Sequence, residues 1–449
     1  MRLMDIYNNL PIMLQNIACT CVGKNIQRKR YNNQFVECWN EAIRLEHLSA
    51  DEKCVYRDQK IAEIVEYAYF HVPYYKKKWD ELGINYKEIN SLDKLNRLPI
   101  INKREVVQNR DAFLSNEYIG KKNNVNELHT SGTTGAGLNL KMTREAEAMN
   151  WAIGWREHNR IGITRDMWCA YFAGRPIVPA RQEQPPFYRI NEAGKQIMFS
   201  CFHLNDKSFL SYVDELNKRQ PMWFHGYPSV IGLLAKYMVN ANVNLAYQPK
   251  VITLSSETVT MEQREYIRKA FNVNPLQTYG QTECVAYFRD YIPEEIYVVE
   301  DYSAVEFVNM GDGLTHIVGT NFYNKAMPLI RYDTHDLASC IETPHGRKVI
   351  KIDGRVEDYI TLSDGSKIGR MDHIFKGANH VVEAQIVQKS LNELWINIVK
   401  DSNYSDKDEK EIQTLLKERI GNRIMYRLNY VEKIPRTANG KIRFVVSEI

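Results

Sequence analysis

A glycine- and hydroxyl-rich stretch, TSGTTGAG at residues 130–137, contains the residue types that bind phosphate. Its three glycines, Gly132, Gly135 and Gly137, permit positive φ and close approach, so successive N–H groups can converge on an anion. Four Ser and Thr hydroxyls add donors. The familiar phosphate loop ends in Gly-Lys-Ser/Thr, whereas this stretch has no lysine. It is therefore either a phosphate site whose positive charge comes from elsewhere in the chain or an ordinary polar loop.

Four further stretches place polar and charged side chains at predicted turns and junctions. TYGQTE, for example, combines an aromatic ring, a glycine, a hydroxyl and a carboxylate at the end of a strand. Each stretch on its own is equally consistent with a common structural feature: a turn, a surface ion pair, a linker or a hairpin. The stretches are TYGQTE (278–283), IRYDTHDLA (330–338), DGRVEDYI (353–360) and PRTANGK (435–441).

The spacing of apolar residues predicts the helices and strands that position these stretches. An early helix ends at Pro73. Alternating strands and helices in the middle of the chain predict a mixed α/β sheet with functional turns at strand ends. The predicted segments are a helical face formed by Ile61, Ile64, Val65 and Ala68, strands at 251–254 and 276–278, and a helix at 263–271.

Beyond residue 353 the pattern changes to short strands, such as 394–399, and one helix. Ser405 and Asp408 predict a capping box for that helix, and Asn439-Gly440 predicts a terminal hairpin. The 449 residues exceed what one core usually serves, so we expect two domains. These are a large α/β N-terminal body, 1–353, and a small α+β C-terminal domain, 354–449. The buried stripe of the helix is predicted at Ile412, Leu415, Leu416 and Ile420.

Charge and cysteine usage exclude several classes of protein. The net charge is 59 − 55 = +4, too balanced to indicate a nucleic-acid surface. The eight cysteines form no CxxC pair and have no zinc-site spacing with histidine. This pattern is typical of reduced thiols in a cytoplasm.

The apolar stretch 10–22 is too short to span a bilayer, and with Gln15 and Asn16 it makes a poor signal sequence. We therefore expect no transmembrane segment here but a helix packed on the body, with weak membrane-surface contact as the alternative. The basic stretch 24–30 is a solvated arm, or a contact for an anionic substrate or a membrane.

In this order, the five motifs resemble the core motifs of the adenylate-forming superfamily, which includes acyl-CoA synthetases and luciferases. Residues 64–84, 98–106 and 225–231 are similar to the phenylacetate-CoA ligase branch. The opening, 10–32, is similar to the capsular-polysaccharide subgroup of that branch, often called CapK-like. The resemblance covers essentially the whole chain. It implies a large N-terminal body that binds ATP and a carboxylic acid, and a mobile C-terminal domain that carries a catalytic lysine.

This resemblance implies a reaction in which a carboxylate attacks the α-phosphate of ATP, releases pyrophosphate and leaves an acyl-adenylate. Tyr279 would lie against adenine, Asp336 would accept both ribose hydroxyls, and Arg355 would lie near the ribose. The glycine-rich stretch would hold the β- and γ-phosphates. The residues implied for nucleotide binding are Thr130, Ser131, Gly132, Thr133, Thr134, Gly135, Ser256, Glu257, Tyr279, Gly280, Asp336 and Arg355.

The positive charge missing from the glycine-rich stretch would come from two other places. Thr282 would reach the α-phosphate, and Glu283 would bind Mg²⁺, a hard cation that prefers oxygen ligands. Lys441 would bridge the attacking carboxylate and the α-phosphate. Glu357 would be the hinge about which the C-terminal domain swings between the two half-reactions.

Two features depart from the family pattern. Because the glycine-rich stretch lacks its usual lysine, pyrophosphate contacts would be weaker or would come from Lys141 or Arg144. His335 occupies a position where glycine or a basic residue is common.

The sequence says less about the acid and the acceptor than about the nucleotide site. Resemblance to the capsule subgroup favours an amine or hydroxyl acceptor on a sugar derivative; a CoA thiol is the runner-up. A non-catalytic nucleotide-binding scaffold is the alternative from another class. Candidates for contact with an anionic sugar or nucleotide are Arg156, Arg175, Arg181 and Arg189, which are equally explained as ordinary surface arginines. Candidate pocket residues are Trp151, His225, Tyr227 and Ser229, which aromatic core packing explains equally well.

Overall fold

The computed structural model describes residues 3–121, 124–129, 138–179, 181–311, 313–355, 359–363, 367–368, 371–375, 380–420, 424–437 and 442–449. The chain forms two compact units, each assembled from separate segments: unit 1 comprises 1–169, 189–197 and 276–352, and unit 2 comprises 170–188, 198–275 and 353–449. The domain division at residue 353 stays a prediction, because unit 2 combines the C-terminal segment with two segments from the middle of the chain.

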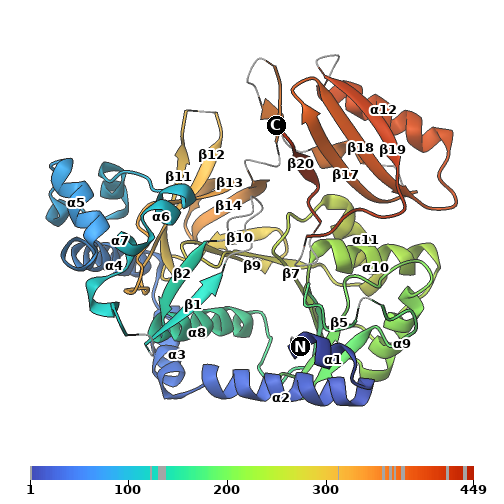
Figure 1. The fold of residues 1–449 in the computed structure, drawn as a ribbon, viewed down its shortest axis with the longest axis horizontal. Coiled ribbons are helices and arrows are strands. Elements are labelled where there is room, and N and C mark those ends of the chain that lie inside the picture. The colour runs from blue at the N-terminus through green and yellow to red at the C-terminus, as the bar shows by residue number, and fades with distance from the viewer. Residues whose placement is uncertain are drawn as a thin grey trace. The chain divides into compact units, whose positions relative to one another are not determined.

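Local signals set the ends of the helices in unit 1 (Figure 1). Helix α4 begins with a capping box between Ser49 and Glu52. It ends before Pro73, which occupies the first turn of α5, so the predicted break is confirmed. The four predicted apolar positions of α4 are buried. The helices are α1 (Leu3–Asn8), α2 (Ile12–Arg30), α3 (Asn33–Glu46), α4 (Ala50–His71), α5 (Pro73–Glu81), α6 (Lys103–Gln108), α7 (Arg110–Phe113) and α8 (Arg144–Arg160).

Helix α2 confirms the predicted N-terminal helix and extends it to Arg30. The basic stretch 24–30 is therefore helical, because its lysine, arginine and glutamine residues are good helix formers. Lys24, Arg28 and Lys29 are exposed, as predicted for a solvated stretch. The helix packs along residues 189–197. Gly23 approaches Asn191 so closely that a Cβ atom on the glycine would stand 2.0 Å from Oδ1.

The strands of unit 1 lie in the order β11-β12-β13-β14-β10-β9-β8, and β1 pairs separately with β2. Neighbouring strands are antiparallel in the pairs β8–β9, β9–β10, β10–β14, β11–β12 and β12–β13. The strands are β1 (Val125–His129), β2 (Asn139–Thr143), β8 (Leu276–Gly280), β9 (Tyr287–Ile292), β10 (Glu295–Val298), β11 (Ser303–Asn309), β12 (Thr315–Asn321), β13 (Tyr332–Thr343) and β14 (Gly346–Arg355).

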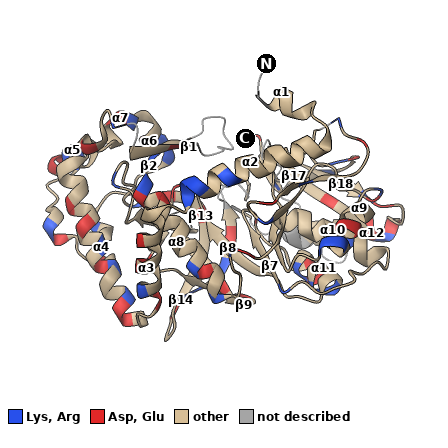
Figure 2. Ribbon diagram, turned by 90° about the horizontal axis from the view of Figure 1, so that it is seen from below, with Lys and Arg blue, Asp and Glu red and all other residues tan. Residues whose placement is uncertain are grey.

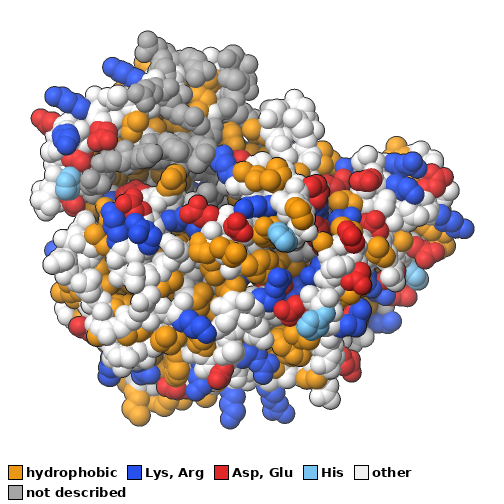
Figure 3. Space-filling view, turned by 180° about the vertical axis from the view of Figure 1, so that it is seen from behind, with side chains coloured by type: hydrophobic (Ala, Val, Ile, Leu, Met, Phe, Trp, Pro, Cys, Tyr) orange, Lys and Arg blue, Asp and Glu red, His pale blue; other side chains and the backbone are white. Residues whose placement is uncertain are grey.

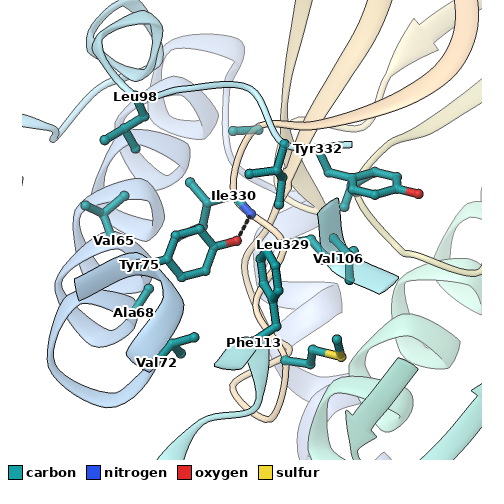
Figure 4. Close-up of a cluster of buried hydrophobic side chains, with 14 of the residues drawn as sticks. Val65, Ala68, Val72, Tyr75, Leu98, Val106, Phe113, Leu329, Ile330 and Tyr332 are labelled. Carbon is teal, nitrogen blue, oxygen red and sulfur yellow. Dashed lines mark hydrogen bonds between the residues drawn. The ribbon is translucent and has the colours of Figure 1, made fainter. Parts of the chain in front are cut away.

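A buried hydrophobic cluster joins α4 and α5 to residues 327–332 (Figure 4). The hydroxyl of Tyr75 donates to the carbonyl oxygen of Pro328 and accepts from the N–H of Ile330, both at 3.0 Å. Buried backbone groups need such partners, since an unmade hydrogen bond costs about 1–3 kcal/mol. Tyr75 therefore fixes the chain just before β13, the strand that carries the predicted ribose-binding residue Asp336.

Strands β6 and β7 of unit 2 are parallel neighbours, and a helix follows each of them. The predicted strand and helix at 251–271 are confirmed, as is the mixed α/β fold. Strands β3, β4 and β5 contain three of the five points where the chain passes from one unit to the other. The elements are β3 (Cys169–Phe172), β4 (Tyr188–Asn191), β5 (Gln196–Phe199), α9 (Phe209–Arg219), β6 (Trp223–Gly226), α10 (Pro228–Asn240), β7 (Val251–Ser255) and α11 (Met261–Phe271).

The C-terminal segment folds as a sheet in the order β19-β18-β17-β20 with α12 packed on it (Figure 1). Asp408 accepts from the N–H and the hydroxyl of Ser405, at 3.0 and 2.8 Å, so the carboxylate half of the predicted capping box is formed. The predicted stripe of α12 packs in the core of this segment. The elements are β15 (Ile360–Thr361), β16 (Lys367–Ile368), β17 (Val381–Ser390), β18 (Glu393–Lys400), α12 (Asp406–Ile420), β19 (Met425–Tyr430) and β20 (Val445–Ser447).

The predicted terminal hairpin is short. Its turn, Asn439-Gly440, lies outside the described residues, but Arg436 and Ile442 on either side form an antiparallel bridge. Beyond this bridge the chain joins β17 in parallel as β20. Within the described residues the hairpin consists of this one bridge, and the last strand pairs with β17 instead.

Charges of both signs are interspersed along helices such as α4 and α5 (Figure 2). Figure 3 shows hydrophobic side chains scattered among charged ones on the face that it presents. None of the eight cysteines, which all lie within the described ranges, forms a disulfide. Within the described ranges, no helix combines the length and the apolar character that crossing a membrane requires.

Candidate active site

Several predicted site residues lie outside the part of the chain that the structure describes. These are the glycine-rich stretch 130–137, the hinge residue Glu357, the catalytic Lys441 and the side chain of Arg355. The flanks of the glycine-rich stretch are described: His129 stands opposite Asn139 in the β1–β2 ladder. The stretch therefore connects two paired antiparallel strands.

Tyr279 and Asp336 are brought together in unit 1, from β8 and β13. The Tyr279 hydroxyl donates to Oδ2 of Asp336 at 2.7 Å, and the tyrosine ring stacks on Phe288 with centroids 4.7 Å apart. Burial, together with the negative charge of Asp336, raises the pKa of the Tyr279 hydroxyl well above its ordinary value. The hydroxyl therefore stays a neutral donor at physiological pH, and it orients the carboxylate predicted to accept the ribose hydroxyls.

A local distortion of β13 directs Asp336. The register of β12 against β13 shifts between His316 and Val318. His335 adopts a φ of +59°, and its N–H donates to Asp333 Oδ1 at 2.9 Å. This left-handed conformation is one that glycine adopts more readily than histidine. A bulge of this kind turns a side chain out of the regular alternation of a strand.

The motif LPII, which in the sequence is only a point of family resemblance, supports the same strand. The N–H of Ile101 donates to the carbonyl of Arg331, and its carbonyl accepts from the N–H of Asp333, each at 2.9 Å. Arg331 is itself fixed by a two-pronged ion pair with Glu306, at 2.9 and 2.8 Å. Residues 98–101 are therefore part of the support for Asp336, a role that their spacing alone does not reveal.

Gly280, Thr282 and Glu283 follow Tyr279 at the end of β8. The N–H of Cys284 donates to the carbonyl of Gln281 at 3.1 Å, which closes a turn around Thr282 and Glu283. Thr282 is exposed and Glu283 partly buried. Mg²⁺ is commonly held by one or two carboxylates together with phosphate oxygens, so a single carboxylate here fits the predicted metal. The roles of these residues stay predictions.

Glu257, for which the resemblance implies a place beside adenine, accepts hydrogen bonds from two other parts of unit 2, and its role at the nucleotide stays a prediction. Its carboxylate accepts from the N–H and the hydroxyl of Ser229, at 3.0 and 3.1 Å, and from the N–H of Ile442 at 3.2 Å. Ser229 lies in the first turn of α10, where the helix dipole favours an anion. Burial raises the pKa of Glu257. The carboxylate therefore links the start of α10 to the residue that follows Lys441, whereas neighbouring Ser256 is exposed.

The residues predicted for the acid pocket divide between the units. In unit 2, His225 Nδ1 lies 2.8 Å from Thr253 Oγ1, and the N–H of Tyr227 donates to the carbonyl of Phe172 at 2.9 Å. In unit 1, the Arg30 guanidinium covers the ring of Trp151, 3.4 Å from its centroid. The contact at Trp151 supports the packing alternative, and a pocket formed by these residues stays a prediction.

Two of the four candidate arginines for an anionic ligand are buried and bind protein groups instead. Arg156 is 1% exposed; it bonds Glu157 at 2.8 Å and pairs with Asp301 through both terminal nitrogens. Arg189 is fully buried, and its Nε donates to Gln15 Oε1. Both interpretations, as sugar contacts or as surface residues, are wrong for this pair, because buried guanidinium groups must be paired within the protein. Arg175 and Arg181 are exposed.

The fold is that of the adenylate-forming ligases. The structure matches 2-hydroxyisobutyryl-CoA ligase in the postadenylation state with R3-HIB-AMP at a TM-score of 0.69 and 17% identity, covering 89% of this chain and 90% of that chain. It matches an open conformation of that ligase with 2-HIB-AMP and CoA at 0.53 and 18%, covering 87% and 90%.

Sequence comparison specifies the relationship further. Residues 360–448 match the family model of the CapK C-terminal domain. The chain is 27% identical to protein CapK of Staphylococcus aureus over 99% of both chains. It is 22% identical to phenylacetate-coenzyme A ligase of Escherichia coli (strain K12) over 71% of this chain and 74% of that protein. The chain is thus a homologue of CapK along its whole length and of the phenylacetate-CoA ligases, which confirms the predicted resemblance.

Asp336→Asn is expected to raise the KM for ATP by about tenfold, because a neutral amide replaces a charged acceptor for the ribose hydroxyls. The measurement is the ATP dependence of acid-dependent pyrophosphate exchange. Glu342→Gln, which neutralises an exposed carboxylate on the same strand, should leave that KM unchanged. An unaltered KM in Asp336→Asn would remove the residue from the nucleotide site.

Proposed function

We propose that this chain is an AMP-forming ligase that activates a carboxylic acid with ATP and transfers the acyl group to an amine or hydroxyl in surface-polysaccharide biosynthesis. The observation that carries the proposal is the Tyr279–Asp336 hydrogen bond within the fold of the adenylate-forming ligases. It joins two motifs that lie 57 residues apart and that both belong to the predicted nucleotide site.

In the first half-reaction, a carboxylate oxygen of the acid attacks the α-phosphorus of ATP, and the bond to pyrophosphate breaks. Asp336 orients the ribose, Thr282 reaches the α-phosphate, and Lys441 bridges the two anions that must meet. Mg²⁺ bound through Glu283 would neutralise charge on the phosphates. In the second half-reaction, the acceptor attacks the acyl carbon and AMP leaves.

Homology to CapK over the whole chain supports an amine or hydroxyl acceptor through the resemblance to the capsule subgroup. Homology to phenylacetate-CoA ligases favours a second candidate, in which CoA is the acceptor and a thioester is the product. Eight cysteines without a disulfide support a cytoplasmic location.

The test is incubation of the protein with ATP and a panel of carboxylic acids, followed by mass spectrometry of the products. Each acid is supplied alone, with CoA, and with amino or hydroxyl sugars. We expect acid-dependent AMP release and an amide or ester of the sugar. A thioester would establish the second candidate, and no AMP from any acid would favour the non-catalytic scaffold.

A further inference from the structure

The first two helices expose an unusual number of large apolar side chains. Seven of the 25 exposed large hydrophobic residues of the described chain fall within residues 4–22. Met13 is the most exposed of them, at 75%. The seven are Met4, Ile6, Ile12, Met13, Leu14, Ile17 and Val22.

The side of α2 that faces the protein is polar instead. Gln15 is 2% exposed, and its amide donates to the carbonyls of Tyr7 and Leu10 at 3.1 and 3.0 Å. Asn16 accepts from the N–H of Ile190 at 3.0 Å. The helix thus buries amides and exposes aliphatic groups, the reverse of an ordinary surface helix. Because apolar surface in water costs free energy, this arrangement indicates that something else covers the outer face.

The charges on the same face indicate what covers it. Met13, Ile17, Lys24 and Arg28 are exposed and separated by 4, 7 and 4 residues, so they follow one face of the helix. The first half of that face is apolar, and the second half is basic; Lys29 is also exposed. Figure 2 shows the Lys and Arg residues gathered in the C-terminal half of α2. A helix that joins exposed apolar groups to basic ones complements an interface of acyl chains and anionic headgroups.

We propose that α1 and α2 dock this protein reversibly on an anionic lipid surface, with the apolar half of α2 seated at the level of the acyl chains and its lysine and arginine side chains against the phosphates. The two signals act together, since neither a short apolar face nor a few basic residues suffices for stable attachment. This docking does not depend on the ligase activity.

The test is co-sedimentation of the full chain with vesicles of phosphatidylcholine alone or of phosphatidylcholine with about 30% phosphatidylglycerol. Binding should require the anionic lipid and weaken at high salt. Lys24→Gln/Arg28→Gln/Lys29→Gln is expected to reduce the partition coefficient by about tenfold or more. Met13→Gln/Ile17→Gln should reduce it by about tenfold, because two aliphatic side chains no longer leave water.

Val55→Gln/Met425→Gln is the control, because it removes two apolar side chains elsewhere that are exposed at 69% and 72%, against 75% for Met13 and 49% for Ile17. It should bind as the unaltered chain does. Thermal melts of all variants check folding, which substitutions at exposed positions should preserve. Absence of binding, or equal binding of all variants, would overturn the proposal. So would a dimer in light scattering that Met13→Gln/Ile17→Gln dissociates, since the apolar face would then cover a second copy.

Discussion

Lys441→Ala is expected to lower the rate of acyl-adenylate formation by about 100- to 1000-fold, the usual cost of removing one group that stabilises charge in a transition state. In the proposed reaction, an anionic carboxylate approaches an anionic α-phosphate. An ammonium that bridges both reduces their repulsion, and residues 130–137 contain no lysine that could replace it. The measurement is acid-dependent exchange of labelled pyrophosphate into ATP.

The N–H of Ile442 donates to Glu257, which holds the backbone of the residue after Lys441 near the start of α10. Lys433→Ala is the control; it removes an exposed lysine shortly before the motif and should exchange pyrophosphate normally. Transfer from acyl-adenylate supplied from outside should survive in Lys441→Ala, since that step no longer joins two anions. Normal exchange without Lys441 would refute the proposed chemistry.

Glu357→Pro is expected to leave pyrophosphate exchange intact while lowering product formation by more than about 100-fold. A hinge must change φ and ψ between the two half-reactions, whereas proline fixes φ near −65°. Locking the C-terminal segment would misplace the groups needed for transfer, and a misplacement of about 1 Å can cost 100-fold. The two rates are measured on the same preparation, one with pyrophosphate and one with the acceptor.

Glu357→Lys provides the control at the same position. It changes the charge but leaves the backbone free, so both half-reactions should persist if the residue acts through its backbone. Equal loss of both rates in Glu357→Pro would contradict the hinge assignment, because a hinge between the two half-reactions should affect transfer alone.

Features that depend on near neighbours can be predicted from the sequence. The helix break at Pro73 follows from the missing N–H and the fixed φ of proline. The buried stripe of α12 follows from the helical repeat, and the strand at 251–254 from a short apolar run followed by a helix. The relationship to adenylate-forming ligases can also be recognised, because motifs are properties of the chain.

Features that depend on distant partners cannot be predicted in this way. Nothing near Arg156 indicates its pairing with Asp301, 145 residues away, so the sequence alone favours a surface or ligand-binding role for this arginine. The contact of Glu257 with Ile442, 185 residues away, is hidden for the same reason. A buried charge takes its partner from whatever the fold brings near, and spacing along the chain does not encode that partner.

Helix α2 shows both what the sequence determines and what only the tertiary structure decides. The sequence predicted a helix only in the apolar stretch 10–22, and the helical repeat of 3.6 residues per turn determines which of its side chains share a face. Only the tertiary structure decided which face turns inward, since Arg189 and the backbone of Ile190 offer partners to amides rather than to aliphatic groups. Hydrogen bonds buried on one side thereby leave Met13 and Ile17 exposed on the other.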